Sequence, residues 1–201
     1  MRNAIILAAG KGTRMKSSQS KVMHRLIDRP MLAYIIDALR AVGVERIVVV
    51  VGYQAESIKA AFHDVEFALQ EPQLGTGHAV MQCTQLKDAQ GDTVIINGDG
   101  PCIQPETLER LFQTNKDASC TLLTAELEDA GAYGRIVRDA KGNVTSIVEA
   151  KDCTDQQKQI REINAGMYCF KNQDLFENLS KLQTNNAQNE YYLTDMVSIL
   201  A

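Results

Sequence analysis

The amino-acid sequence predicts an α/β protein with a mostly parallel sheet, helices on both faces of that sheet, and a smaller mixed β part in the second half. As far as residue 118, short β-branched runs alternate with segments of helical periodicity, which is the order of strand–helix–strand units in a parallel sheet. The run RIVVVVG, residues 46–52, is almost continuously apolar. Such runs are typical of strands covered on both faces.

The elements of the first half follow one another in a regular order. Strands are predicted at residues 3–8, 46–52, 65–70 and 92–98, and helices at residues 31–42, 54–62, 77–86 and 104–112. The first helix rests on apolar residues at helical spacing up to Val42, and Gly43 ends it. The glycines of LGTG open the third helix, and Pro105 stands where a helix start tolerates proline.

After residue 118 the pattern changes to strands with little helix between them. These strands are predicted at residues 120–127, 133–139, 143–150 and 164–170, with a hairpin turn in DAKGNV, residues 139–144. We expect them to form a second layer, partly antiparallel, followed by helices at residues 172–182 and 193–201. The predicted organisation is therefore one domain, residues 1–201, with halves 1–118 and 119–201. Because the last helix reaches residue 201 without a stop signal, we expect the natural chain to continue.

Composition limits the possible classes of protein. The chain is 45% hydrophobic and 23% charged, as in ordinary globular proteins. It has no stretch near the ~20 apolar residues of a membrane span, and AIILAA is too short for a signal peptide. We therefore expect a cytoplasmic protein with no membrane partner. Five widely spaced cysteines without a C-x-x-C pair argue against a zinc site or a disulfide framework.

Charge is distributed unevenly along the chain. The formal net charge is −4, but residues 1–29 carry seven Lys/Arg and one acidic residue. This local excess on an acidic chain predicts an anion-binding site. The basic cluster is short and contains no interleaved aromatic residue, so we expect no nucleic-acid partner.

The loop after the first strand is the first candidate site. Ligands of open α/β sheets bind at the carboxyl ends of the strands. Gly10 and Gly12 allow backbone N–H groups to approach an anion, while Thr13, Arg14 and Lys21 add polar and basic groups. Neither the G-x-G-x-x-G nor the P-loop spacing fits. The alternative is a glycine-rich turn with solvated lysines.

Three further constellations carry polar chemistry. Asp99 follows a buried strand and is a candidate Mg²⁺ ligand, or a plain turn residue. Gln70 and the helix start at Gly75 could read the edge of a base, or simply cap the helix. Glu149 and Asn164 stand in apolar strands and either bind a sugar hydroxyl or are satisfied within the sheet. The three histidines have no partner at ligand spacing and are interpreted as structural or solvated.

Together, the segments LAAGKGTRM, QLGTGHA, GDGPCI, YGRIV, IVEAKD, EINAG and NNAQNEYYLTD resemble one family over nearly the whole chain. The family is the N-terminal uridyltransferase domain of the bacterial bifunctional N-acetylglucosamine-1-phosphate uridyltransferase/glucosamine-1-phosphate acetyltransferase. The resemblance implies a Rossmann-like fold of the nucleotide-diphospho-sugar transferase type. It also implies formation of UDP-N-acetylglucosamine and pyrophosphate from UTP and N-acetylglucosamine 1-phosphate, with Mg²⁺, for peptidoglycan and lipopolysaccharide precursors.

The resemblance also assigns roles to residues. Arg14 and Lys21 would be catalytic, and Asp99 would bind Mg²⁺. The nucleotide would contact Leu7, Ala8, Ala9, Gly10, Gly12, Thr13, Lys21, Gln70, Gly75, Thr76, Asn97 and Gly98. The sugar phosphate would contact Gly134, Glu149, Asn164, Tyr192 and Thr194.

This chain departs from the family at several points. Ser20 precedes Lys21 where the family usually has proline, so a less rigid loop is expected. The family's second Mg²⁺ ligand and its C-terminal left-handed β-helix acetyltransferase domain lie beyond residue 201, and a homotrimer is expected only with that domain. Two alternatives remain open: a sister sugar-1-phosphate nucleotidyltransferase with another sugar or base, and an inactive nucleotide-sugar-binding fragment.

Overall fold

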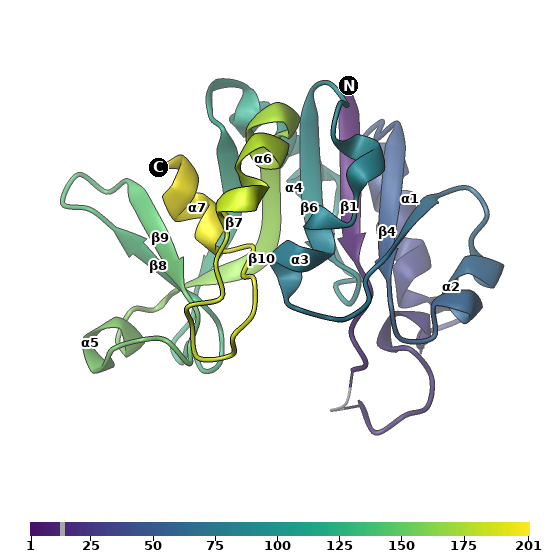
Figure 1. Ribbon diagram of the computed structural model, residues 1–201, viewed down its shortest axis with the longest axis horizontal. Helices are drawn as coiled ribbons and strands as arrows, with labels where there is room; N and C mark the ends of the chain where they lie inside the picture. The colour runs from purple at the N-terminus through teal and green to yellow at the C-terminus, as the bar shows by residue number, and fades with distance from the viewer. Residues whose placement is uncertain (13–14) are drawn as a thin grey trace.

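The computed structural model describes residues 1–12 and 15–201, and it confirms the predicted α/β fold (Figure 1). Within these residues, eight strands form one mixed sheet in the order β5-β4-β1-β6-β10-β8-β9, with β7 paired along β10. The N-terminal strand therefore lies inside the sheet, and later elements are added on both sides of it.

Four neighbouring strands run parallel: β1 (Arg2–Leu7), β4 (Arg46–Val51), β5 (Glu66–Leu69) and β6 (Asp92–Asn97). Along β1, Ala4 and Ile6 pack in one hydrophobic cluster, whereas Ile5 packs in a second cluster on the opposite face. This alternation follows from the two-residue period of a strand. Because both faces are covered, the strands read as continuous apolar runs.

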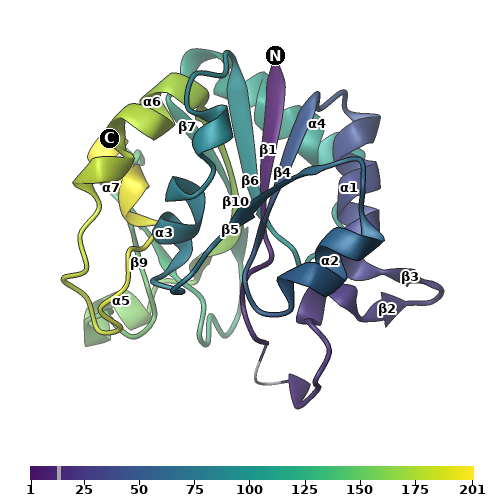
Figure 2. The same cartoon turned by 45° about the vertical axis from the view of Figure 1, so that its right-hand side comes forward.

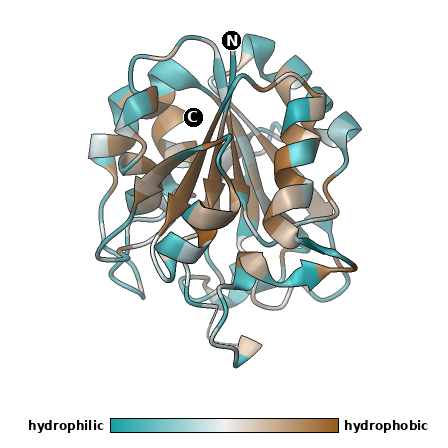
Figure 3. Ribbon diagram, turned by 90° about the vertical axis from the view of Figure 1, so that its right-hand side faces the viewer, coloured by the Kyte–Doolittle hydropathy of each residue, from teal (hydrophilic) through white to brown (hydrophobic). Residues whose placement is uncertain are grey.

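Helices cover both faces of the sheet, as Figure 2 and Figure 3 show. One face packs against α1 (Met31–Ala41), α2 (Ala55–Ala61) and α4 (Pro105–Thr114). The other face packs against α3 (Thr76–Met81), α6 (Asn172–Asn178) and α7 (Asp195–Leu200). The helix predicted at residues 77–86 is divided, because α3 ends at Met81 and a separate 3-10 turn spans Thr84–Leu86.

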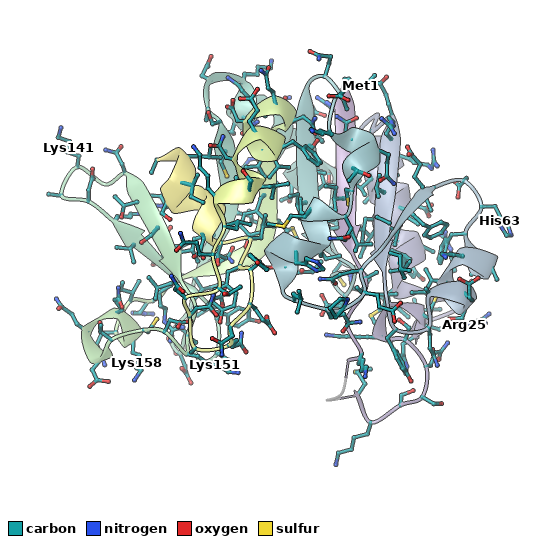
Figure 4. All side chains as sticks on the ribbon, in the orientation of Figure 1. Met1, Arg25, His63, Lys141, Lys151 and Lys158 are labelled. Atoms are coloured by element: carbon teal, nitrogen blue, oxygen red, sulfur yellow. The ribbon has the colours of Figure 1, made fainter. Side chains whose placement is uncertain are left out.

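The second half differs from the predicted second layer. Its strands are β7 (Cys120–Glu126), β8 (Arg135–Arg138), β9 (Val144–Val148) and β10 (Glu162–Lys171). β10 pairs antiparallel with β6, so the sheet continues from one half of the chain to the other. β8 and β9 form the predicted hairpin, and Figure 4 shows Lys141 at its tip, pointing away from the body of the molecule. A short helix, α5 (Asp155–Lys158), precedes β10.

Two smaller features complete the fold. A hairpin of β2 (Arg25–Leu26) and β3 (Arg29–Pro30) precedes α1. Across the described parts of the chain, none of the helices combines the length and the apolar character that crossing a membrane requires.

Replacement of Ile5 by alanine tests the packing of the central strand. Ile5 is fully buried, so Ile5→Ala should lower the free energy of unfolding by about 2–5 kcal/mol in a denaturant titration. Ile27→Ala is the matched control, because Ile27 is 92% exposed and makes few contacts that the substitution could remove. Its effect should stay within about 0.5 kcal/mol. Equal losses in the two variants would contradict the assigned burial of β1.

Candidate active site

A cavity of about 760 Å³ opens at the carboxyl ends of the parallel strands. Leu7 ends β1 and Asn97 ends β6, and both line it. Two smaller hollows of about 340 and 290 Å³ share Leu7 and Asn97 with it, so the three adjoin one another. Residues from both halves line the largest cavity: Leu7, Lys21, Thr76, Asn97, Asp99, Ala132, Tyr133, Gly134, Glu149, Asn164, Ala165, Gly166, Tyr168, Leu193 and Thr194.

The loop after β1 forms one wall of the smaller hollows. The backbone carbonyl of Ala9 accepts hydrogen bonds from the Tyr53 N–H at 3.1 Å and from Nε2 of Gln73 at 2.5 Å. Gly12 has a φ of 59°, and a Cβ there would lie 2.9 Å from Cβ of Lys21. The close approach therefore requires glycine at this position. The predicted residues Thr13 and Arg14 lie outside the described residues.

Ser20 holds this loop close to the start of α2. Its φ of −55° is one that proline also adopts. Unlike proline, Ser20 has a backbone N–H, and this group donates to Oε1 of Gln54 at 2.8 Å. Nε2 of Gln54 donates to the carbonyl of Ser18. The side-chain amide of Gln54 thus bonds to the backbone at both Ser18 and Ser20, just before Lys21.

Lys21 and Asp99 form an ion pair at the mouth of the cavity. The first follows the β1 loop and the second follows β6, so the pairing of β1 with β6 brings them together. Their side chains are 31% and 38% exposed. Partly exposed pairs of this kind contribute only about 0–1 kcal/mol, so an arriving anion and cation can replace the pair at low cost.

The donor set around Asp99 is compatible with Mg²⁺. Across residues 1–12 and 15–201, no group of three His, Cys, Asp or Glu side chains could hold a metal ion by itself. Mg²⁺ does not require such a group, because it is usually bound by one or two carboxylates together with substrate phosphates and several waters. A single accessible carboxylate beside Lys21 fits this pattern.

The start of α3 and Gly75, which precedes it, are held by residues 191–194. The N–H of Gly77 donates to the carbonyl of Tyr191 at 2.7 Å, and Oγ1 of Thr76 accepts from the N–H of Leu193 at 2.9 Å. Gly75 has a φ of 107°, and a Cβ there would lie 2.6 Å from the carbonyl oxygen of Tyr191. The backbone at Gly75 therefore lies too close to the backbone at Tyr191 for any residue with a Cβ atom at position 75.

Gln70 is fixed beside this loop. It is 5% exposed, and its Nε2 donates to the carbonyl of Gly75 at 2.9 Å. Nδ1 of His78 lies 3.3 Å from the same nitrogen. Gln70, Gly75 and Thr76 all line the hollow of about 340 Å³, so the structure brings these three predicted residues together.

Four predicted sugar-phosphate residues also meet in the large cavity: Gly134, Glu149, Asn164 and Thr194. Oγ1 of Thr194 donates to Oε1 of Glu149 at 3.2 Å, and Nδ2 of Asn164 donates to the hydroxyl of Tyr168 at 2.6 Å. Tyr192, the fifth, is 6% exposed and its hydroxyl accepts from Gln188. Unlike the other four, Tyr192 does not line this cavity.

The carboxyl of Glu149 is held in an unfavourable environment for its charge. Burial raises its pKa above the ordinary value, while the hydrogen bond from Thr194 opposes this shift in part. The carboxylates of Asp152 and Asp195 raise the pKa further. A buried acid with a raised pKa inside a cavity is a common property of binding and catalytic sites.

Gly166 and Tyr168 also line the cavity, although they were not among the site residues predicted from the sequence. Gly166 has a φ of 74°, and a Cβ there would lie 2.6 Å from Nδ2 of Asn97. The pairing of β10 with β7 shifts register between Asn164 and Tyr168. An isolated glycine within a strand pattern predicts such a bulge. Gly166, in the segment NAG at residues 164–166, was therefore the sequence feature that could have indicated it.

Residues 4–190 match the family model of the MobA-like NTP transferase domain. The chain belongs to this family. Its cavity at the carboxyl ends of parallel strands is where a nucleotide-binding α/β domain is expected to bind its ligand. Membership in the MobA-like family therefore agrees with the fold and with the location of the cavity.

Relatives and solved structures add detail. The bifunctional proteins GlmU of Geobacillus sp. (strain WCH70) and Enterococcus faecalis (strain ATCC 700802 / V583) are 49% and 50% identical over 203 residues. Each alignment covers 99% of this chain and 44% of the relative, so the chain spans less than half the length of these relatives.

Solved structures of other proteins share the fold, and two of them illustrate the likeness. A UDP-glucose pyrophosphorylase complexed with UDP-glucose superposes with a TM-score of 0.80 at 20% identity, covering 99% of this chain and 86% of the other. HddC from Yersinia pseudotuberculosis superposes with a TM-score of 0.69 at 22% identity, covering 96% and 84%. At these identities the likeness concerns the fold of the MobA-like domain alone.

Glu149 provides a test based on pH. Because the folded state raises its pKa, the folded state binds this proton more tightly than the unfolded chain does. The free energy of unfolding should therefore fall as pH rises from the ordinary glutamate pKa, about 4.3, through the raised value. Glu149→Gln removes the cost of burying this negative charge. The variant should therefore be more stable than the parent protein at pH 7.5, with little difference in stability below pH 4.

Denaturant titrations at the two pH values measure this difference. Glu56→Gln is the control, because the side chain of Glu56 is 88% exposed. A Glu149→Gln variant that is less stable than the parent at pH 7.5 would show that burial does not disfavour the charge at this position.

Proposed function

We propose that the chain is a uridyltransferase that makes UDP-N-acetylglucosamine and pyrophosphate from UTP and N-acetylglucosamine 1-phosphate. One observation carries the proposal: the Lys21–Asp99 pair lies in the same cavity as Glu149 and Asn164, and Gln70 lines the adjoining hollow. A charged reaction centre thus adjoins both a pocket for a base and a pocket for a sugar. The similarity to two GlmU proteins at about half identity supports the same reaction.

The chemistry needs no general base. A phosphate oxygen of the sugar 1-phosphate attacks the α-phosphorus of UTP and forms a new O–P bond. The bond from the α-phosphorus to the oxygen that bridges the α- and β-phosphates breaks, and pyrophosphate leaves with that electron pair. The nucleophile is already an anion, so no proton has to be removed. The protein must instead hold two anions together and stabilise the charge that develops.

Lys21 and Asp99 divide this task. With substrates bound, Asp99 would hold Mg²⁺, which neutralises negative charge on the phosphates. Lys21 would exchange its contact with Asp99 for a contact with a phosphate, while Gly10 and Gly12 leave room for backbone N–H groups to approach. Preorganised charge of this kind commonly supplies the largest part of the rate enhancement. We assign Arg14 the same role as Lys21 on the resemblance alone.

The two pockets account for substrate choice. Gln70 is held by Gly75, and its fixed amide can pair with the edge of uracil. On the other side, the Glu149 carboxylate, the Asn164 amide and the Thr194 hydroxyl can pair with sugar hydroxyl and acetamido groups. The proposal includes a cytoplasmic location, where UTP is available, and a role in supplying cell-wall precursors.

Pyrophosphate release tests the proposed reaction. The chain is mixed with UTP, N-acetylglucosamine 1-phosphate and Mg²⁺, and other sugar 1-phosphates and nucleoside triphosphates are tested in parallel. We expect turnover with the named pair and at least tenfold less with the other combinations. Preference for another sugar or base would favour a sister nucleotidyltransferase.

Substitutions at the ion pair test the assigned roles. Lys21→Met should lower kcat about 10²–10³-fold, which corresponds to roughly 2.7–4 kcal/mol of lost transition-state stabilisation. Asp99→Asn should abolish turnover, and raising the Mg²⁺ concentration should not restore it. Asp64→Asn is the control, because Asp64 is exposed and paired with Arg40 outside the cavity. A Lys21→Met variant with unchanged kcat would exclude Lys21 from the reaction.

A further inference from the structure

Arg135 is a buried charge next to the sugar pocket. It is 4% exposed and follows Gly134, which lines the large cavity. Its guanidinium donates to three backbone carbonyls of one turn. Nη2 donates to Gly131 at 3.0 Å, and Nη1 donates to Tyr133 and, at 3.4 Å, to Ala130.

A buried arginine is usually paired with a carboxylate, and here the three carbonyl contacts take the place of that carboxylate. Among the described carboxylates, none forms a salt bridge with Arg135. Arginine does not lose its proton in proteins, so its charge must be compensated where it lies. Here the compensation comes from carbonyl dipoles that converge from a single turn, residues 130–133. If this turn opens, the buried charge loses its partners, and the turn is therefore held in one conformation.

The same turn forms a wall of the cavity. Ala132, Tyr133 and Gly134 line it beside Glu149 and Asn164. The Gly134 carbonyl accepts from the N–H of Asn164 at 2.9 Å, and a Cβ on Gly134 would lie 3.5 Å from Oε2 of Glu149. A shift of the turn therefore moves the wall against which these two polar side chains are placed.

We propose that Arg135 is a positioning residue that sets the affinity for the sugar part of the ligand without contacting it. This inference rests on the proposed function of the cavity. It assigns Arg135 to the sugar pocket alone, because the hydrogen bonds of its guanidinium go to carbonyls within residues 130–133. The base pocket is built from Gln70 and the loop before α3, which Arg135 does not contact.

Replacement by lysine removes the fork of donors but keeps the charge. A lysine ammonium is a point charge on a flexible stem and cannot hold three carbonyls in the geometry of a guanidinium. Calorimetric titration of the whole chain with UDP-N-acetylglucosamine and, separately, with UTP measures the consequence without requiring turnover. Arg135→Lys should bind UDP-N-acetylglucosamine at least tenfold more weakly than the parent protein, with UTP affinity unchanged within twofold.

The chain provides a matched control and a second variant. Arg138→Lys is the control, because Arg138 lies on the same strand but pairs with Glu162 and the Gly142 carbonyl outside the cavity. Gly131→Ala strains the turn from its other side, since Gly131 has a φ of 45° with open space around the added Cβ. It should cause the same selective loss, and it decides the question if Arg135→Lys does not fold.

The outcomes separate the two proposals. If the parent protein binds neither UTP nor UDP-N-acetylglucosamine, the proposed function is wrong and the role of Arg135 is lost with it. If the parent binds both, but the turn variants bind UDP-N-acetylglucosamine normally or lose UTP equally, only the role of Arg135 is overturned.

Discussion

The adjacency of β1, β6 and β10 is the constraint on which the site depends. β1 and β6 run parallel, so their carboxyl ends bring Gly10, Lys21 and Asp99 to one edge of the sheet. β10 is antiparallel to β6, so its N-terminal part reaches the same edge. The bulge between Asn164 and Tyr168 then places Asn164 and Gly166 in the cavity. One mixed sheet thus brings the residues proposed to bind the nucleotide and those proposed to bind the sugar together from distant parts of the chain.

Two of the charges at the site are compensated locally. Lys21 and Asp99 form an ion pair at the cavity mouth, and backbone carbonyl dipoles stabilise the charge of Arg135. Glu149 is the exception, because burial raises its pKa and only Thr194 supports its charged form. In the proposed function, binding of a phosphate and a cation at the mouth is an exchange of ion pairs, which avoids the large cost of leaving a charge uncompensated.

Local patterns predicted the parallel half and the position of the site. Continuous apolar runs identified β4 and β6, and the rule that ligands bind at strand ends led to Gly10 and Asp99. The pattern did not show that β10 joins β6, because pairing between distant segments has no local signature. For the same reason the contact between Lys21 and Asp99 was not predicted. The resemblance assigned Tyr192 to the sugar phosphate, and in the structure its hydroxyl accepts a hydrogen bond from Gln188.

The segment Tyr191–Thr194 touches both halves of the cavity. It holds the first residues of α3, Thr76 and Gly77, and it supports Glu149 through Thr194. In the proposed function, the backbone of residues 191–194 therefore supports the pocket for the base and the pocket for the sugar. Gln70 is held separately, because its side chain donates to the Gly75 carbonyl and lies beside His78, outside this segment.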